Sequence, residues 1–298
     1  MKDIERAPEV KFWCDQIDIY ENEFRTWETR SRKIVKRYKD ERGENDKSVR
    51  FNILWSNIQT LLPALYAKNP IPNVDRRFQD DDKLGTVSAQ VLERAVTYFV
   101  DSDDFADVMK QVTLDRLLCG RGTAWIRYEV TDQSPLLSDD EDDPETPESV
   151  QYSEEVEIDH VHWEDFGHTW GRTWQEVRAV WRKVYLSKKQ LKKRFGKLSE
   201  KIPLDFVPEK NGEKIKGAGE KATVYEIWDR ESKKVFWVSK SYKDLLDQRD
   251  DPLKLHDFFP CPKPVFATLA NDSLIPSPDF AQYQDQARED RKSTRLNS

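Results

Sequence analysis

The sequence predicts an α+β protein in which long helices come first and a strand-rich part follows. Apolar residues recur at helical spacing through most of residues 13–117, a period typical of amphipathic helices. Short runs of alternating, β-branched and aromatic residues prevail from residue 123 onward and favour strands. With 298 residues, of which 37% are hydrophobic, the chain has the length for about two domains with a substantial core.

The first predicted helix carries an aromatic stripe on one face and basic residues on the other. The stripe steps by three and four positions over about thirty residues, with one polar gap at Ser31. Gly43 and Asn45 are expected to end this helix. We expect the basic face to be solvated, and contact with DNA or with another subunit is the alternative. The stripe is Trp13, Ile17, Tyr20, Phe24, Trp27, Ile34 and Tyr38, and the basic face is Arg30, Arg32, Lys33, Lys36, Arg37 and Lys39.

In residues 51–77 a second apolar run leads directly into a Pro-x-Pro segment. Pro70 and Pro72 should force the chain into extended geometry, because proline fixes its own φ and restricts the residue before it. A helix that ends in such a rigid strut is expected to be an architectural element. The apolar positions at helical spacing are Leu54, Ile58, Leu61, Leu62 and Leu65.

Two further helices are predicted on either side of a short acidic turn. The first spans Val87 to Phe99 and the second spans Phe105 to Leu117. The turn holds several carboxylates, but a calcium-binding EF-hand loop needs glycine where Ala106 stands. We therefore expect Asp104 to cap the second helix.

The Gly120-Arg121-Gly122 sequence is predicted to be a turn that leads into a strand over Thr123–Val130. It lacks the following glycine and the Lys-Ser/Thr pair of a phosphate-binding loop. Alternation along the strand should place four residues on one face. These are Ala124, Ile126, Tyr128 and Val130.

The rest of the chain divides by composition. Residues 134–149 contain seven carboxylates and no basic residue, so they are expected to form a flexible acidic insert. The Gly- and Lys-rich residues 209–221 are expected to be a flexible linker between two substructures. A hairpin is predicted around Arg230–Lys234. The predicted organisation is a helical region 1–133, the insert 134–149, a strand-rich region with a short helix 150–208, the linker 209–221, a second strand-rich region 222–278, and the start of a long helix 279–289.

Charge and cysteine content exclude several classes. The net charge is -7, and a tight nucleic-acid binder needs a basic footprint that displaces counterions. Cys14, Cys119 and Cys261 are odd in number and far apart, which predicts reduced thiols in a cytoplasmic setting without a disulfide frame or a zinc site. The sequence shows no secretory signal and no stretch suited to span a bilayer, so we expect no membrane contact.

One cluster of residues allows an enzymatic alternative. His160 and His162 would lie on the same face of a strand, and Asp165 could complete a metal site. The cluster lacks an established ligand spacing such as H-E-x-x-H, and histidines beside acidic groups are common on strand surfaces. We therefore expect no catalytic residue, no cofactor-binding residue and no metal, with a metal-dependent enzyme centred on His160 and His162 as the alternative.

The ordered set of these segments resembles portal proteins of tailed phages, and podovirus-like portals in particular. Three blocks carry the resemblance. The first is the order of helix, proline strut, paired helices, glycine turn and strand in residues 51–130. The second is the segment Trp163–Phe195, in which an acidic-aromatic pair opens a strand-rich region and a short helix follows a serine cap. The third is Thr223–Glu289, with the motifs VYEIWD, FFPCPKP, IPSPDF and QYQDQARE.

The resemblance implies a portal-like fold and a structural role. Residues 1–133 would form the helical wing, residues 222–278 the clip and stem region, and Asp279 would begin a long helix. The implied function is a subunit of the ring that forms the DNA-translocation channel at the capsid vertex, used in genome packaging, head-tail joining and DNA ejection. Mild acidity is compatible with a channel wall that repels phosphate. Another phage connector or scaffold protein is the second alternative.

The implied partners are copies of the chain itself, twelve in a ring, together with the components of a phage head. These are the terminase large subunit, a head-tail adaptor, capsid and scaffolding proteins, and double-stranded DNA that passes without sequence preference. The protein would reside in the virion after assembly in the host cytoplasm. The candidate partner-binding residues are Phe236, Trp237, Lys240 and Tyr242.

The last nine residues, 290–298, resemble the translation of a sequencing adapter. Phe280, Tyr283 and Ala287 begin a helical apolar face, and this pattern stops at Asp290 without a glycine cap or a proline. We expect native sequence to end at about Glu289, so that this chain is the N-terminal part of a longer protein, and we expect no functional residue within the tail.

Overall fold

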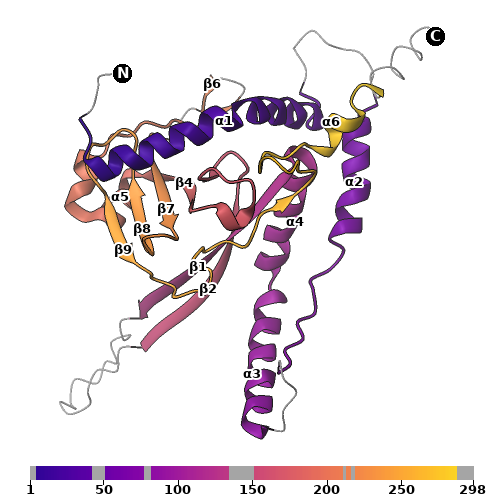
Figure 1. The fold of residues 1–298 in the computed structure, drawn as a ribbon, viewed down its shortest axis with the longest axis horizontal. Coiled ribbons are helices and arrows are strands. Elements are labelled where there is room, and N and C mark those ends of the chain that lie inside the picture. The colour runs from indigo at the N-terminus through magenta and orange to yellow at the C-terminus, as the bar shows by residue number, and fades with distance from the viewer. Residues whose placement is uncertain are drawn as a thin grey trace, which may run out of the picture.

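The computed structural model describes residues 5–41, 51–76, 82–133, 151–210, 213–215 and 219–286. It confirms the α+β class, because long helices lie beside antiparallel sheets. Figure 1 shows α1 lying along the strands β4, β7 and β8, with α2, α3 and α4 gathered at the opposite end from the N-terminus. The predicted insert 134–149 and tail 290–298 lie outside the described residues.

Helix α1 (Pro8–Tyr38) confirms the aromatic stripe. It ends at Tyr38, so the predicted end at Gly43 and Asn45 is wrong; both residues lie outside the described part of the chain. Asp40 adopts a left-handed φ of 52°, and Glu41 N then donates to Lys36 O at 3.0 Å. Aspartate thus closes the helix in the way glycine usually does. The buried stripe residues are Trp13, Ile17, Tyr20, Phe24, Trp27 and Ile34, and Tyr38 is half-buried.

Three more helices follow: α2 (Ile53–Leu65), α3 (Lys83–Val100) and α4 (Asp103–Cys119). Each begins after a polar side chain that accepts a backbone N–H of the first turn. In α4 this cap is Ser102, whose hydroxyl accepts from Phe105 N at 3.2 Å, so the prediction of Asp104 is wrong. The helix starts one residue before Asp104, which therefore lies in the first turn near the positive end of the helix dipole.

Gly120 ends α4 and β1 follows at once. Its φ of 88° suits glycine, and β1 (Arg121–Gln133) includes Arg121 and Gly122, which were predicted to be a turn. β1 pairs with β2 (Gln151–Val161) in an antiparallel ribbon, and the short β10 (Val265–Phe266) flanks β1 on its other edge. The buried face of β1 carries Trp125, whereas Ile126 and Tyr128 of the predicted apolar face are exposed.

A five-stranded antiparallel sheet in the order β3-β4-β7-β8-β9 forms the rest of the body. The predicted hairpin around residues 230–234 is confirmed as β7 and β8. The strands are β3 (Phe166–His168), β4 (Ala179–Ser187), β7 (Lys221–Asp229), β8 (Lys234–Val238) and β9 (Asp247–Asp250).

Short elements connect the strands. The predicted short helix after a serine cap is α5 (Lys188–Phe195), with Ser187 in a capping box. α6 (Asp279–Tyr283) begins where the sequence predicts, but it ends at Tyr283, so the prediction of a long helix from Asp279 is wrong. Because β4 and β7 are neighbours in one sheet, residues 209–221 do not separate two substructures, and that prediction is wrong. The remaining elements are the 3-10 helices Trp174–Glu176 and Gly196–Lys201 and the strands β5 (Glu209–Lys210) and β6 (Glu213–Lys214).

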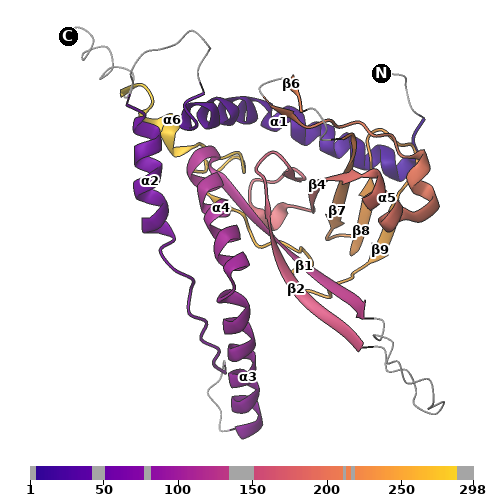
Figure 2. The ribbon, with the colours of Figure 1, turned by 180° about the vertical axis from the view of Figure 1, so that it is seen from behind.

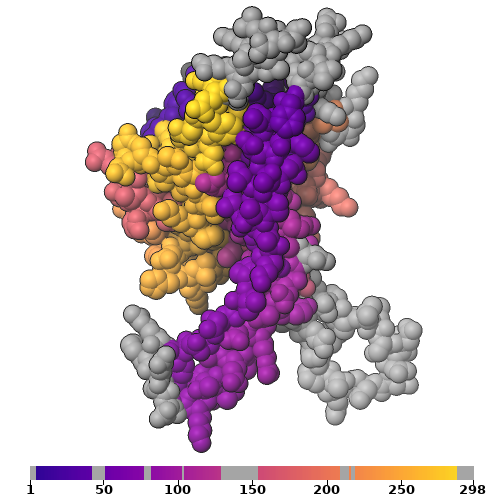
Figure 3. All heavy atoms as spheres, turned by 90° about the vertical axis from the view of Figure 1, so that its right-hand side faces the viewer, coloured from indigo at the N-terminus to yellow at the C-terminus, as the bar shows by residue number. Residues whose placement is uncertain are grey.

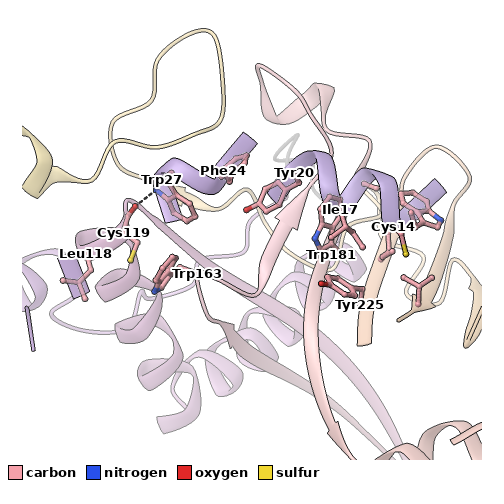
Figure 4. Close-up of a cluster of buried hydrophobic side chains, with 14 of the residues drawn as sticks. Cys14, Ile17, Tyr20, Phe24, Trp27, Leu118, Cys119, Trp163, Trp181 and Tyr225 are labelled. Atoms are coloured by element: carbon pink, nitrogen blue, oxygen red, sulfur yellow. Dashed lines mark hydrogen bonds between the residues drawn. The ribbon is translucent and has the colours of Figure 1, made fainter. Parts of the chain in front are cut away.

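The main core lies between α1, the sheet and the end of α4. Figure 4 shows the α1 side chains pointing down onto Trp163, Trp181 and Tyr225. Trp27 Nε1 donates to the carbonyl oxygen of Cys119 at 2.8 Å, and the Trp27 and Trp163 rings meet edge to face at 5.5 Å. This contact ties α1 to the α4–β1 junction.

Arg121 is fully buried at the start of β1. Its Nη2 donates to the carbonyl oxygens of Trp163 at 2.9 Å and of Phe166 at 3.0 Å. Its guanidinium carbon lies 4.6 Å from the Trp27 ring centroid and 5.1 Å from that of Phe166. Among the described residues no carboxylate forms an ion pair with it, so ring faces and carbonyl oxygens stabilise the charge.

His168 lies beside this charge and should make stability depend on pH. Burial, assisted by the Arg121 charge, lowers the pKa of His168 to about 3. In the unfolded chain its pKa is about 6.5. As the pH falls below about 6.5 the unfolded state binds a proton that the folded state does not. Stability should therefore fall by up to about 1.4 kcal/mol per pH unit until the pH approaches the folded value.

We expect His168→Phe to make this dependence shallower between pH 6 and pH 4. Denaturant unfolding at several pH values measures the slope of the free energy of unfolding against pH. His256 is fully exposed, and His256→Phe is the matched control. An unchanged slope in His168→Phe would mean that other groups cause the acid sensitivity.

Candidate functional site

Helix α3 and the proline strut form an arm that projects from the body. We define the arm as residues 66–76 and 82–100. Figures 1 and 2 show the strut descending from α2 beside α3, which returns towards the body. The arm extends beyond the level of the sheet. The two parts are antiparallel and linked along their length. The links are Asn69 Nδ2 to Val100 O at 2.6 Å, Val74 N to Glu93 Oε2 at 3.0 Å, and Arg76 Nη1 to Asp82 Oδ2 at 2.8 Å.

The arm exposes an apolar stripe. Val100, at the end next to the body, is the residue of α3 that is buried. Leu84, Val87, Val91 and Tyr98 recur at spacings of three, four and seven residues, so they share one face of the helix. Their exposed fractions run from 55% for Val87 to 86% for Tyr98. Contiguous exposed apolar surface of this kind is typical of interaction sites.

Helix α2 and the strut also expose apolar residues. Trp55, Leu61 and Leu65 of α2 and Ile71 of the strut are exposed as well. Figure 3 shows α2 and the arm as one continuous ridge on the face of the molecule turned towards the viewer. Leu54 and Ile58 point the other way, since both are buried in the main core. Helix α2 therefore anchors the arm on one side and presents apolar residues on the other.

An acidic groove of about 970 Å³ lies where the arm joins the body. Its walls are the end of α3, the first turns of α4 and strand β2. Apolar residues such as Phe99, Val108 and Val156 line part of it. The lining also includes seven carboxylates. It includes no Lys or Arg, so the groove should attract cationic groups. The carboxylates are Asp101, Asp104, Asp107, Glu154, Glu155, Glu157 and Asp159.

Part of this negative charge is unpaired. Asp159 accepts from Arg182 Nη1 at 2.9 Å, Glu157 pairs with Arg127, and Asp107 pairs with Lys110 at 3.0 Å. Within the described ranges, no ion pair forms at Asp101, Asp104 or Glu155. All three are exposed.

The histidines of the metal alternative have separate surroundings. His160 lies on β2, and its Nε2 is 2.7 Å from Asp115 Oδ2 of α4. β2 ends at Val161, so the prediction that both histidines lie on one strand is wrong. The His162 ring is tilted against Trp163, with 5.4 Å between ring centroids.

Asp165, the third residue of that alternative, accepts a hydrogen bond from Tyr185 Oη at 2.8 Å. Burial raises the pKa of Asp165. In the part of the chain that the structure describes, no group of three or more His, Cys, Asp or Glu side chains could hold one metal ion. The geometry thus gives the enzymatic alternative no support.

The four candidate partner-binding residues mainly hold the body together. Phe236 is buried against Trp13 of α1, and Tyr242 is buried in a smaller core beneath α5. Lys240 Nζ donates to Asp18 at 2.7 Å and to Glu21 at 2.8 Å, which fastens α1 to the sheet. Trp237 is half-buried between Arg194 and Arg249. Of these four residues, only Trp237 could be reached by a partner without breaking the core packing or the ion pairs that join α1 to the sheet.

No protein-family model matches the chain, and no curated protein matches it. Within the described ranges, none of the helices is both long enough and apolar enough to cross a membrane. The arm and the acidic groove are the two surfaces of the described chain that stand out, one for its exposed apolar residues and the other for its carboxylates. Sequence reasoning missed both as sites, although it predicted each helix that builds them.

Proposed function

We propose that the chain is a structural subunit of a tailed-phage portal ring. The observation that carries this proposal is the arm, which exposes a helical apolar stripe for which the described chain supplies no cover. The arm also lies in the first of the three blocks of sequence that resemble portals, in which a helix, a proline strut and paired helices precede a glycine turn and a strand.

Repeated contact between copies explains the exposed stripe. A projecting element on one subunit can pack on a different surface of the next, and such heterologous contacts close into a ring when the rotation is suitable. The hydrogen bonds between the strut and α3 stiffen the arm, which lowers the entropy cost of association. The resemblance to portals implies a ring of twelve.

The ring would act as the channel for double-stranded DNA at the capsid vertex. Its work would be genome packaging, head-tail joining and DNA ejection, in the virion and after assembly in the host cytoplasm. A net charge of -7 supports passage of DNA without tight binding, because an acidic surface repels phosphate. The resemblance implies the remaining partners, which are the terminase large subunit, a head-tail adaptor, and capsid and scaffolding proteins.

Native mass spectrometry of the product of the complete reading frame tests this proposal. We expect one dominant oligomer, of about twelve subunits, across a wide range of protein concentration. A protein that remains monomeric at every concentration would contradict the proposal. A ladder of unlimited length would instead indicate an open filament and would also contradict it.

A further inference from the structure

Part of the acidic groove has no cationic partner among the described residues. Asp101 and Glu155 stand on opposite walls, one at the end of α3 and the other on β2, and neither forms an ion pair with any described residue. The apolar residues Phe99, Val108 and Val156 line the same groove and could cover the aliphatic part of long basic side chains. The groove therefore fits a basic helical surface better than a bare ion.

Helix α1 carries a basic surface that is complementary in charge to the groove. Arg30, Lys33 and Lys36 are exposed and repeat every three residues along the second half of the helix. Among the described residues none of the three is in an ion pair, whereas the neighbouring Arg32 pairs with Glu164 at 2.6 Å. The stripe of α1 on the other side of the helix is buried in the core.

These two surfaces are on different parts of the molecule. Figure 1 shows α1 along one edge, whereas the groove lies at the junction of α3, α4 and β2, on the far side of the core from the exposed face of α1. One chain cannot bring its own α1 into its own groove without unfolding. Two copies can, because the basic surface of one can reach the groove of the next.

We infer that the basic surface of α1 docks in the acidic groove of a second copy of this chain. The inference rests on the proposed ring and names the contact between its neighbours. The contact is heterologous, so each copy uses its α1 on one side and its groove on the other, as a closed ring requires. Opposite charges on the two surfaces would also speed the encounter and fix the register.

DNA is the other class of partner that the basic surface of α1 could contact. The groove favours a second copy of the chain over DNA. DNA on α1 would leave the groove carboxylates unpaired, whereas a second copy would pair both surfaces at once. The chain as a whole is acidic, which further disfavours a stable DNA complex.

Charge reversal tests the inference on the product of the complete reading frame. One variant carries Arg30→Glu and Lys33→Glu, and the other carries Asp101→Lys and Glu155→Lys. Each variant alone brings like charges together at every contact, which should weaken association by about 100-fold or more at low salt. Sedimentation velocity measures the oligomer, and far-ultraviolet circular dichroism with thermal unfolding shows whether each variant is folded.

Mixing the two variants in equal amounts is the decisive step. The reversed α1 of one variant fits the reversed groove of the other, and the two unchanged surfaces fit each other, so an alternating ring should form in the mixture. Matched controls reverse exposed charges elsewhere: Lys188→Glu with Lys189→Glu, and Glu200→Lys with Asp272→Lys. These controls should assemble like the wild type.

Three results would overturn the inference. If the wild type and both variants form the same ring, the groove contact is wrong and the proposed function survives. If the α1 variant loses binding to duplex DNA in a gel-shift assay but still assembles, the basic surface serves DNA. If the wild type itself never assembles, the proposed function fails and the groove contact fails with it.

Discussion

Replacing Trp27 by Ala is expected to lower the free energy of unfolding by about 3–5 kcal/mol. Trp27 is 3% exposed and packs edge to face on both Phe24 and Trp163. Its loss would open a cavity and leave the Cys119 carbonyl oxygen without its indole donor. It would also remove the nearest of the rings around the buried Arg121 charge. An effect of this size is a large fraction of the 5–15 kcal/mol that typical domains possess.

Denaturant unfolding followed by fluorescence measures this change. Arg30→Ala on the exposed face of the same helix is the control and should change the free energy of unfolding by no more than about 0.5 kcal/mol. Equal effects of the two substitutions would show that α1 does not bury the face assigned to it.

Changing Val87 and Val91 together to Asp is expected to abolish assembly. The two valines lie one turn apart in the exposed stripe of α3, so in a single subunit the new carboxylates remain in water and stability should change little. In a ring they would enter an apolar contact, and an unpaired buried charge costs several kcal/mol for each ion.

The control for this prediction is Thr86→Asp with Gln90→Asp. These polar residues are exposed, have the same spacing on the same helix and change the net charge equally. Sedimentation velocity should give monomers for the valine variant and the wild-type oligomer for the control. Full assembly of the valine variant would mean that the stripe is not an interface.

The sequence predicted elements whose signals are local. The stripe of α1 could be read from its period alone, because seven residues at helical spacing leave one consistent face. The capping of α5 by Ser187 and the β7–β8 hairpin depend on a few adjacent residues and were also predicted. Single caps are harder, since Ser102 and Asp104 are both good N-cap residues and only the position of the helix start decides between them.

The sequence did not predict features that depend on distant contacts. Residues 209–221 have the composition of a linker, yet β4 and β7 on either side of them pair along their whole length. Arg121 looked like part of a glycine turn, and its burial depends on rings from α1 and on carbonyl oxygens more than forty residues away.

The sequence also does not predict that the apolar face of the arm is exposed. The period of α3 shows that it has an apolar face, but a sequence does not say whether that face packs inside its own chain or on another. The groove likewise joins carboxylates from Asp101 to Asp159, which only the fold brings together.

Electron microscopy of the product of the complete reading frame would show directly whether the protein forms the proposed ring. We expect closed rings with a central channel wide enough for duplex DNA, in which the apolar stripe of α3 is covered by a neighbouring subunit. We also expect Val87 and Val91 to lie in the contact between neighbours. Single globular particles, or rings in which the arm remains exposed to solvent, would mean that the proposed ring contact is wrong.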